Sequence, residues 1–257
     1  MKKRPIFIAF STQKGGVGKS VFSVLSASYL HYKQNYNVLF VDCDYPQSSL
    51  LKMRQRDLKR VEQDELIKEK FAKQYENTGK VPYPILCSAP ETAISVVETY
   101  LDGSDEQIDI VFIDLPGTIL TAGVLKTISD IDYVFTPIIA DRMVLESSIS
   151  FALAANSALI GQDGNRLKSV HLFWNRVDFR ERTDLYELYN ESLREMGLSV
   201  MDTIIPDRKR FCKEYTDGSK DKVFRSTIFP FNPRVEIGTN FKGLLTEVME
   251  IINLELK

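Results

Sequence analysis

The chain has 257 residues, and its 33 Lys and Arg residues nearly balance its 35 Asp and Glu residues, which gives a formal net charge of −2. This balance excludes a protein that is basic throughout, so any contact with nucleic acid must come from local patches. Two histidines and three cysteines without a C-x-x-C pair argue against a His or Cys metal cage and against a disulfide framework. No apolar run approaches the roughly 20 residues of a spanning helix. We therefore expect a cytoplasmic protein with no transmembrane segment.

Short apolar runs alternate with longer segments of helical spacing along the chain. We expect strands at 6–10, 38–41, 110–113, 133–139 and 170–174, and helices at 21–32, 93–101, 145–159, 185–196 and 241–252. Strands that are buried on both faces form continuous apolar runs, so this alternation predicts an α/β fold with a mostly parallel, twisted sheet and helices on both faces. There is no Pro/Gly/Ser-rich linker and no internal repeat, which predicts one domain over residues 1–257.

Two stretches carry unusually dense charge. Residues 52–80 begin with five basic side chains and have only a partial apolar stripe, and we interpret them as a charged helical insert, solvated on the domain edge. The alternative is a helical arm for a partner or for DNA. A second basic stretch follows Pro206, and we interpret it as a solvated helix face that could also contact a phosphate backbone. It consists of Arg208, Lys209, Arg210 and Lys213.

A glycine-rich loop, Lys-Gly-Gly-Val-Gly-Lys-Ser at 14–20, follows the first predicted strand and opens the first predicted helix. Glycines let successive backbone N–H groups point at phosphate oxygens, and the helix N-terminus adds partial positive charge. Lys19 would reach the β- and γ-phosphates, and the Ser20 hydroxyl would ligate Mg²⁺. The common G-x-x-x-x-G-K-[ST] pattern fails at Gln13, and the loop has a second lysine, Lys14. The alternative is a glycine turn with a chance Gly-Lys-Ser.

Carboxylates end two further predicted strands. Asp42 and Asp44 end the run that starts at Val38, and Asp114 ends the run that starts at Ile110. Ligands bind beyond the carboxyl ends of the strands in an open parallel sheet, so these acids are expected near the glycine-rich loop. Asp114 fits a strand-end acid that holds Mg²⁺ through water. The alternative for Asp42 and Asp44 is a strand-end turn that uses Asp as a cap. For Asp114, an apolar run followed by Asp is a common pattern when taken alone.

The loop with its extra Lys14 resembles the deviant Walker A box of the ParA/MinD/Soj family, which are dimerising ATPases of plasmid and chromosome partition and of division-site placement. The resemblance extends from residue 3 to about residue 210. It implies a single-domain P-loop NTPase fold, ATP and Mg²⁺ as cofactors, and an ATP-dependent homodimer. In such a dimer, Lys14 would cross to the phosphates that the other subunit binds.

The resemblance also implies individual roles. Asp44 would orient the attacking water, Asp42 would lie near the Mg²⁺ shell, Asn175 would bond the adenine edge, and Thr203–Asp207 would pack on the base. The alternative for Asn175 is a turn or helix cap. The chain departs from the family where Tyr45 precedes Pro46-Gln47 and where Gly117 replaces a second proline, which would loosen that switch. The Asp-Cys-Asp-Tyr-Pro-Gln variant at 42–47 resembles TraA-like ParA homologues of Bacteroidetes conjugative elements.

The expected site residues fall into three groups by role. The catalytic residues are Lys14, Lys19 and Asp44. The metal ligands are Ser20, Asp42 and Asp114. The nucleotide-binding residues are Lys14, Gly15, Gly16, Val17, Gly18, Lys19, Ser20, Val21, Asn175, Pro206 and Asp207.

The leading hypothesis for function is a slow, partner-stimulated ATPase switch in DNA segregation, partition or conjugative transfer. Nonspecific duplex DNA and a ParB-like or transfer-machinery protein are its expected partners. One alternative is a nucleotide-gated binding module that recruits a protein partner with little intrinsic hydrolysis. A second alternative is a small-molecule kinase or ligase of the same fold, against which Lys14 argues, because a monomeric site has no need for a lysine supplied in trans.

Overall fold

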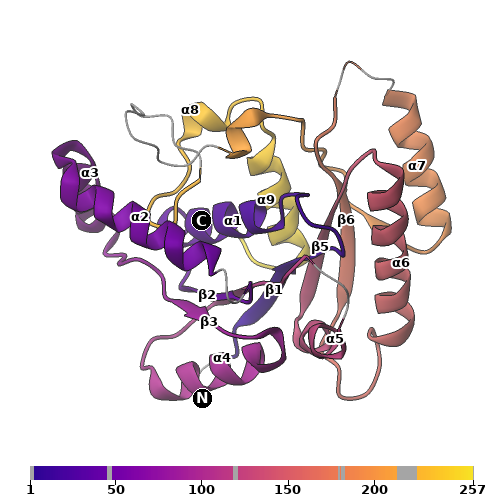
Figure 1. Ribbon diagram of the computed structural model, residues 1–257, viewed down its shortest axis with the longest axis horizontal. Coiled ribbons are helices and arrows are strands. Elements are labelled where there is room, and N and C mark those ends of the chain that lie inside the picture. Colours follow the sequence, from indigo (N-terminus) through magenta and orange to yellow (C-terminus); the bar gives the residue numbers. More distant parts are fainter. Residues whose placement is uncertain are drawn as a thin grey trace.

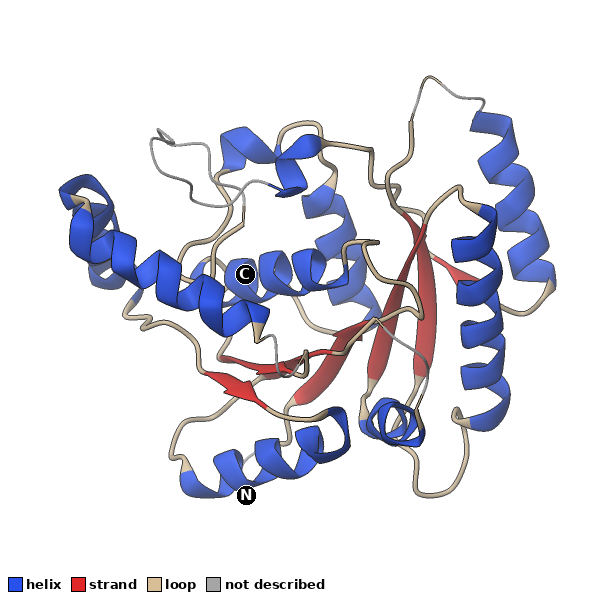
Figure 2. Cartoon of the chain, in the orientation of Figure 1, coloured by secondary structure: helices blue, strands red, loops and turns tan. Residues whose placement is uncertain are grey.

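The computed structural model describes residues 3–44, 48–117, 121–178, 180, 183–212 and 225–256. Within these ranges the chain forms a seven-stranded sheet in the order β3-β2-β4-β1-β5-β6-β7, and every registered pair is parallel (Figures 1 and 2). The strands are β1 (Ile6–Phe10), β2 (Val38–Asp42), β3 (Ile85–Cys87), β4 (Ile110–Asp114), β5 (Tyr133–Ile138), β6 (Ser169–Trp174) and β7 (Ser199–Val200). The strand order reverses direction at β1, which is where an open α/β sheet places its ligand.

Helices cover both faces of this sheet (Figure 1). The helices are α1 (Lys19–Tyr32), α2 (Ser49–Gln63), α3 (Glu65–Thr78), α4 (Ala93–Gly103), α5 (Ala122–Asp130), α6 (Arg142–Ala158), α7 (Thr183–Glu195), α8 (Pro233–Glu236) and α9 (Phe241–Ile251). Side chains of α1, α2 and α9 share one buried core, and side chains of α4, α5, α6 and α7 share the other. The sheet therefore lies between two layers of helices, as expected for an α/β fold.

Alternation along the strands explains why two cores form. In β1, Ile8 and Phe10 belong to the core under α1, whereas Phe7 and Ala9 belong to the core on the opposite face. Successive side chains of a strand point to opposite faces, so a strand with helices on both sides must be apolar at every position. The predicted parallel, doubly covered sheet is confirmed.

The charged segment at 52–80 lies in α2 and α3, and the two helices differ. No residue of α3 is buried, in agreement with a solvated helix. The interpretation is wrong for one face of α2, where Arg54 and Asp57 are buried together with Leu50 and Met53. A helical repeat of charged residues gave no sign of this, because the partners of Arg54 and Asp57 lie far along the chain.

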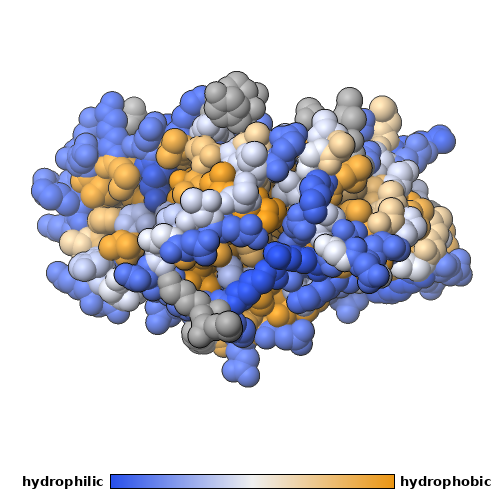
Figure 3. All heavy atoms as spheres, turned by 90° about the horizontal axis from the view of Figure 1, so that it is seen from below, coloured by the Kyte–Doolittle hydropathy of each residue, from blue (hydrophilic) through white to orange (hydrophobic). Residues whose placement is uncertain are grey.

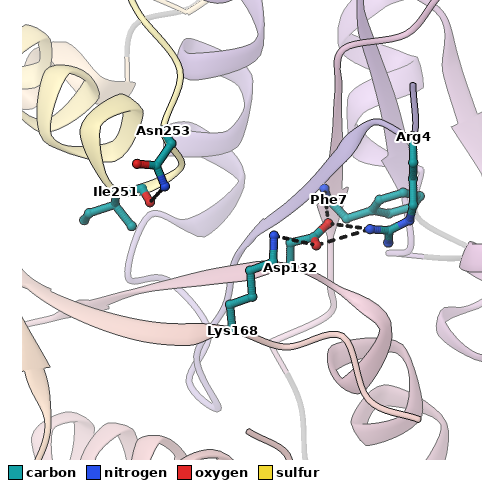
Figure 4. Close-up of polar contacts among 6 residues, drawn as sticks. All are labelled: Arg4, Phe7, Asp132, Lys168, Ile251 and Asn253. Atoms are coloured by element: carbon teal, nitrogen blue, oxygen red, sulfur yellow. Dashed lines mark hydrogen bonds and ion pairs between the residues drawn. The ribbon is translucent and has the colours of Figure 1, made fainter. Parts of the chain in front are cut away.

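A buried carboxylate ties the start of β1 to the start of its neighbouring strand β5 (Figure 4). Asp132, just before β5, accepts a hydrogen bond from the Phe7 amide at 2.9 Å. It also pairs with Arg4 at 3.1 Å and with Lys168 at 3.4 Å. The Arg4 guanidinium in turn lies 4.7 Å from the centre of the Phe7 ring. These contacts hold the amino ends of β1 and β5 together and leave their carboxyl ends to form the site.

The face seen in Figure 3 carries hydrophilic residues that surround patches of hydrophobic ones. In the described ranges, the helices are all too short or too polar to cross a membrane.

Part of the basic stretch after Pro206 forms a 3₁₀ turn at Lys209–Cys212, and the Arg208 guanidinium donates to the Gly238 carbonyl at 3.2 Å. Lys213 lies outside the described residues.

Candidate functional site

The glycine-rich loop joins the end of β1 at Phe10 to the start of α1 at Lys19. Gly16 and Gly18 have φ values of 77° and 95°, in the left-handed region that favours glycine. A Cβ at Gly18 would lie 3.1 Å from a Phe22 ring carbon, whereas one at Gly15 or Gly16 would meet nothing within 4 Å. The loop backbone therefore faces open space, and a phosphate group can approach its N–H groups closely.

Lys19 is the cation at the centre of this loop. Its side chain is 7% exposed, and its ammonium donates to the Lys14 carbonyl at 3.0 Å. Burial lowers the pKa of Lys19, and the negative charges of Asp114 and Asp44 partly oppose that shift. The first turn of α1 carries no acid, so the helix N-terminus and the ammonium together form a site for an anion. Lys14 itself is half-buried in the same loop.

Asp114 lies at the end of β4, in register with Asp42 at the end of β2. It is 1% exposed, and burial raises its pKa to about 7, although the neighbouring Ser20 hydroxyl lowers it. Its Oδ1 atom has no hydrogen-bond partner among the described residues. A buried acid with an unpartnered oxygen beside a hydroxyl fits Mg²⁺, which binds few protein ligands and keeps several waters. This fit needs no larger ligand cluster, and the described part of the chain contains none.

Asp42 and Asp44 follow one another at the β2–α2 connection. Asp42 accepts hydrogen bonds from the Asp44 amide at 3.1 Å and from the Leu50 amide at 2.9 Å, one on each carboxylate oxygen. Both oxygens thus hold the connection and the start of α2. Asp44 is half-exposed near Lys19. Tyr45, Pro46 and Gln47 lie outside the described residues.

The predicted base-binding residues meet the loop from the other side of β1. Asn175, directly after β6, is 4% exposed, and its Nδ2 atom donates to the Val17 carbonyl at 2.9 Å. Asn175 therefore braces the loop in this structure. Pro206 pairs with Val177, and the Asp207 amide donates to the Val177 carbonyl at 3.0 Å. The end of β6 and the segment 203–207 thus lie side by side.

The profile of the CobQ/CobB/MinD/ParA nucleotide-binding domain matches residues 8–220, well over half of the chain. The chain belongs to this family. Its members of the ParA/MinD type are P-loop ATPases, and the match covers the glycine-rich loop, Asp42, Asp114 and Asn175. The family and the fold predicted from the sequence are confirmed.

Solved structures of low sequence identity share the fold. A plasmid partition protein of Borrelia burgdorferi B31 bound to AMPPNP is 18% identical, with a TM-score of 0.60 over 97% of this chain and 100% of that one. The ParA of pNOB8 bound to nonspecific DNA is 16% identical, with a TM-score of 0.56 over 97% and 99%. The MinC:MinD complex of Aquifex aeolicus is 16% identical, with a TM-score of 0.52 over 80% and 83%. No curated protein sequence matches the chain significantly.

Gly117 has a steric role in this family member. A Cβ at Gly117 would lie 2.6 Å from the Lys19 ammonium and 3.1 Å from the Cα of Gly15. The close approach of two backbones accounts for glycine at this position. The expectation from sequence considered conformational freedom alone. Residues 118–120, which follow, lie outside the described ranges.

Arg176 is a site residue that sequence reasoning missed. It has a φ of 55°, and its guanidinium donates to the Gly16 carbonyl of the loop. Its only signal in the sequence is its place next to Asn175. Val21, the last expected loop residue, lies half-buried in the first turn of α1 and packs against the core.

Proposed function

We propose that the chain is a Mg²⁺-dependent ATPase of the ParA type, a dimeric switch that acts in DNA segregation, partition or conjugative transfer. The observation that carries the proposal is that two buried residues of opposite charge lie at one site. Lys19 follows a loop whose Gly16 and Gly18 have positive φ values, and Asp114 has an oxygen without a hydrogen-bond partner among the described residues. The similar partition protein bound to AMPPNP supports ATP as the nucleotide. The similar ParA bound to nonspecific DNA and the MinC:MinD complex support DNA and protein partners.

The site residues would divide the work of phosphoryl transfer by position and charge. Lys19 and the loop amides would hold the β- and γ-phosphates, and Asp44 would orient the attacking water. Ser20 and Asp114 would hold Mg²⁺, directly and through water, with Asp42 behind them at the strand end. When bound, Mg²⁺ neutralises charge that develops on the phosphate oxygens. The ion would also favour the ionised form of Asp114, which burial alone disfavours.

Lys14 would act on the second subunit. A cation supplied across an interface is comparable to an arginine finger and couples phosphate binding to assembly. ATP would thus favour the dimer, and hydrolysis would release it. We expect slow turnover that a ParB-like or transfer-machinery protein stimulates. The free thiols of Cys43 and Cys87 fit the reducing cytoplasm in which such a switch would act.

Light scattering of the purified chain in apo, ADP and MgATP states, combined with a phosphate-release assay, tests this proposal. We expect a dimer in the MgATP state and a monomer in the apo and ADP states. Lys19→Ala should lose nucleotide binding, whereas Lys14→Ala should bind nucleotide but lose both the dimer and turnover. Lys59→Ala, which changes an exposed lysine of α2, is the matched control and should behave as wild type.

Three results would contradict parts of the proposal. Normal dimerisation and hydrolysis by Lys14→Ala would refute the role in trans. A MgATP-dependent dimer without turnover, even with duplex DNA present, would favour a nucleotide-gated binding module. Transfer of the γ-phosphate to a small molecule from a metabolite extract would favour a kinase or ligase.

A further inference from the structure

A groove of about 320 Å³ lies at the end of α1 that is remote from the glycine-rich loop. We call it the α1–α3 groove. The C-terminal end of α1, one face of α3 and the segment Pro230–Pro233 enclose it. Tyr32, Pro230, Phe231 and Pro233 supply its apolar lining. Its volume suits a few side chains of a bound ligand.

Among the described residues, the charged side chains that line the groove are all lysines. Lys33, Lys70 and Lys73 line it and are exposed, and none of the described residues that line it is acidic. At 100° per residue, Lys70, Lys73 and Asn77 share one face of α3. The acids Glu65, Glu69 and Glu76 cluster on the adjacent face, about 90° further round the helix. None of the three lines the groove, so the lysines are the charged residues that α3 presents to it.

Hydrogen bonds hold the walls in place. The Gln74 amide of α3 donates to the Ile228 carbonyl at 2.8 Å, and the Tyr32 hydroxyl of α1 donates to the Thr227 carbonyl at 2.9 Å. Phe71 of α3 also makes an edge contact with Phe229, with ring centres 6.0 Å apart. A groove fixed in this way is formed before its ligand arrives, which lowers the entropic cost of binding.

The aromatic residues of the groove have no free faces for a nucleic-acid base. Tyr32 and Phe231 are 3% and 4% exposed. The Phe231 ring stacks on Tyr29 with centres 4.8 Å apart, and it also packs edge-to-face on Phe241. Recognition of single strands depends on bases that stack on open rings. The groove offers instead an apolar hollow with lysines at its rim.

We propose that the α1–α3 groove docks an acidic peptide segment of a protein partner, which places a large apolar side chain in the hollow and carboxylates beside Lys33, Lys70 and Lys73. Complementary charge at a rim gives such a contact its specificity and association rate. Leu66, 77% exposed one turn before Lys70 on the same face of α3, extends the apolar surface. The 14 residues of α1 separate the groove from the glycine-rich loop by about 20 Å, so docking leaves the nucleotide site open.

Fluorescence anisotropy of the full chain tests the proposal. The probe is a short fluorescein-labelled peptide that is rich in Glu and Asp and has a central Phe-Leu pair. We expect binding in low salt that weakens in about 0.3 M salt, where screening is strong. The double variant Lys70→Glu with Lys73→Glu should weaken binding at least about tenfold. A peptide with Phe-Leu replaced by Ser-Ser, and one with Lys in place of every acid, should also bind at least about tenfold more weakly.

The matched control is Lys52→Glu with Lys59→Glu, which makes the same charge change on exposed positions of α2. It should keep the wild-type affinity for the peptide to within about twofold. Circular dichroism checks that both double variants fold. A fluorescent ATP analogue should bind wild type and both variants alike, so a failure of the docking proposal and a failure of the proposed ATPase are read separately.

Four results would overturn the proposal. The first is no binding of the acidic peptide to wild type in low salt, and the second is an equal loss in both double variants. The third is tighter binding of a single-stranded oligonucleotide through Lys70 and Lys73, which would assign the surface to nucleic acid. The fourth is self-association in sedimentation that Lys70→Glu with Lys73→Glu abolishes, which would make a second copy the occupant.

Discussion

Asp57 of α2 is the residue whose replacement tests most directly how the charged segment is attached. Its Oδ2 atom accepts hydrogen bonds from the Ser226 hydroxyl at 3.0 Å, the Thr227 amide at 2.8 Å and the Thr227 hydroxyl at 2.9 Å. The buried Arg54 guanidinium bonds the same segment through the Thr227 hydroxyl and carbonyl. Asp57→Ala would therefore remove one acceptor from three buried donors and one charge from beside a buried cation.

The expected cost follows from these contacts. The Thr227 amide cannot rotate to another acceptor, and an orphaned buried donor costs about 1–3 kcal/mol. Removal of one partner from a buried charged cluster costs about 3–5 kcal/mol in all, which is the loss of unfolding free energy that we expect for Asp57→Ala. Asp57→Asn keeps an acceptor oxygen and loses only the charge. Its expected cost is about 1.5–3 kcal/mol, of the order of one hydrogen bond to a charged group.

Urea unfolding measures both values. Trp174 is the single tryptophan and is fully buried, so its fluorescence reports unfolding, and far-ultraviolet circular dichroism gives a second probe. Glu62→Ala, an exposed position of the same helix, is the matched control and should change the free energy by no more than about 0.5 kcal/mol. A loss below about 1 kcal/mol for Asp57→Ala, or equal losses for the Ala and Asn variants, would refute the reasoning.

Three further predictions concern the site and α1. Gly117→Ala should weaken the binding of a fluorescent ATP analogue about tenfold, because the added methyl group displaces Lys19; unchanged affinity would contradict the steric argument. Asn175→Ala should reduce the free energy of unfolding in urea by about 1–3 kcal/mol, since the Val17 carbonyl loses its donor. The same variant should also bind the fluorescent ATP analogue more weakly. Burial lowers the pKa of His31 to about 4. His31 thus takes up its proton more readily in the unfolded chain, where its pKa is about 6.5, and stability should fall by about 2 kcal/mol between pH 7 and pH 5. His31→Gln should remove that part of the pH dependence in urea titrations, whereas His171→Gln should retain it.

Much of the fold could be predicted because the strands that carry the site are buried on both faces. β1, β2 and β4 are apolar up to the residue at their ends, and β5 and β6 are mostly apolar. The polar residues of the candidate site lie at or directly after the ends of these strands. β3 and β7 have three and two residues, which is too short for any periodicity to show. They lie at the two edges of the sheet.

The features that could not be predicted from the sequence depend on contacts between segments that are far apart along the chain. The burial of Asp57 requires Thr227, 170 residues away, and no helical repeat encodes that contact. Gly117 is explained by its contact with Gly15 and Lys19, and Arg176 by its contact with Gly16. In each case the residue type is ordinary, and only its contact with a segment that is distant in sequence explains its role.

The two histidines have structural partners away from the glycine-rich loop. His31 is a residue of α1, and its Nε2 atom makes a hydrogen bond of 2.8 Å with the Val81 carbonyl. His171 of β6 makes hydrogen bonds with the hydroxyls of Ser199 and Ser169. Neither contacts the glycine-rich loop, so both have structural partners that account for them. The loop relies instead on backbone amides, a buried ammonium and a buried carboxylate. In the proposed nucleotide site, the amides and the ammonium would stabilise phosphate charge directly, and the carboxylate would do so by holding Mg²⁺.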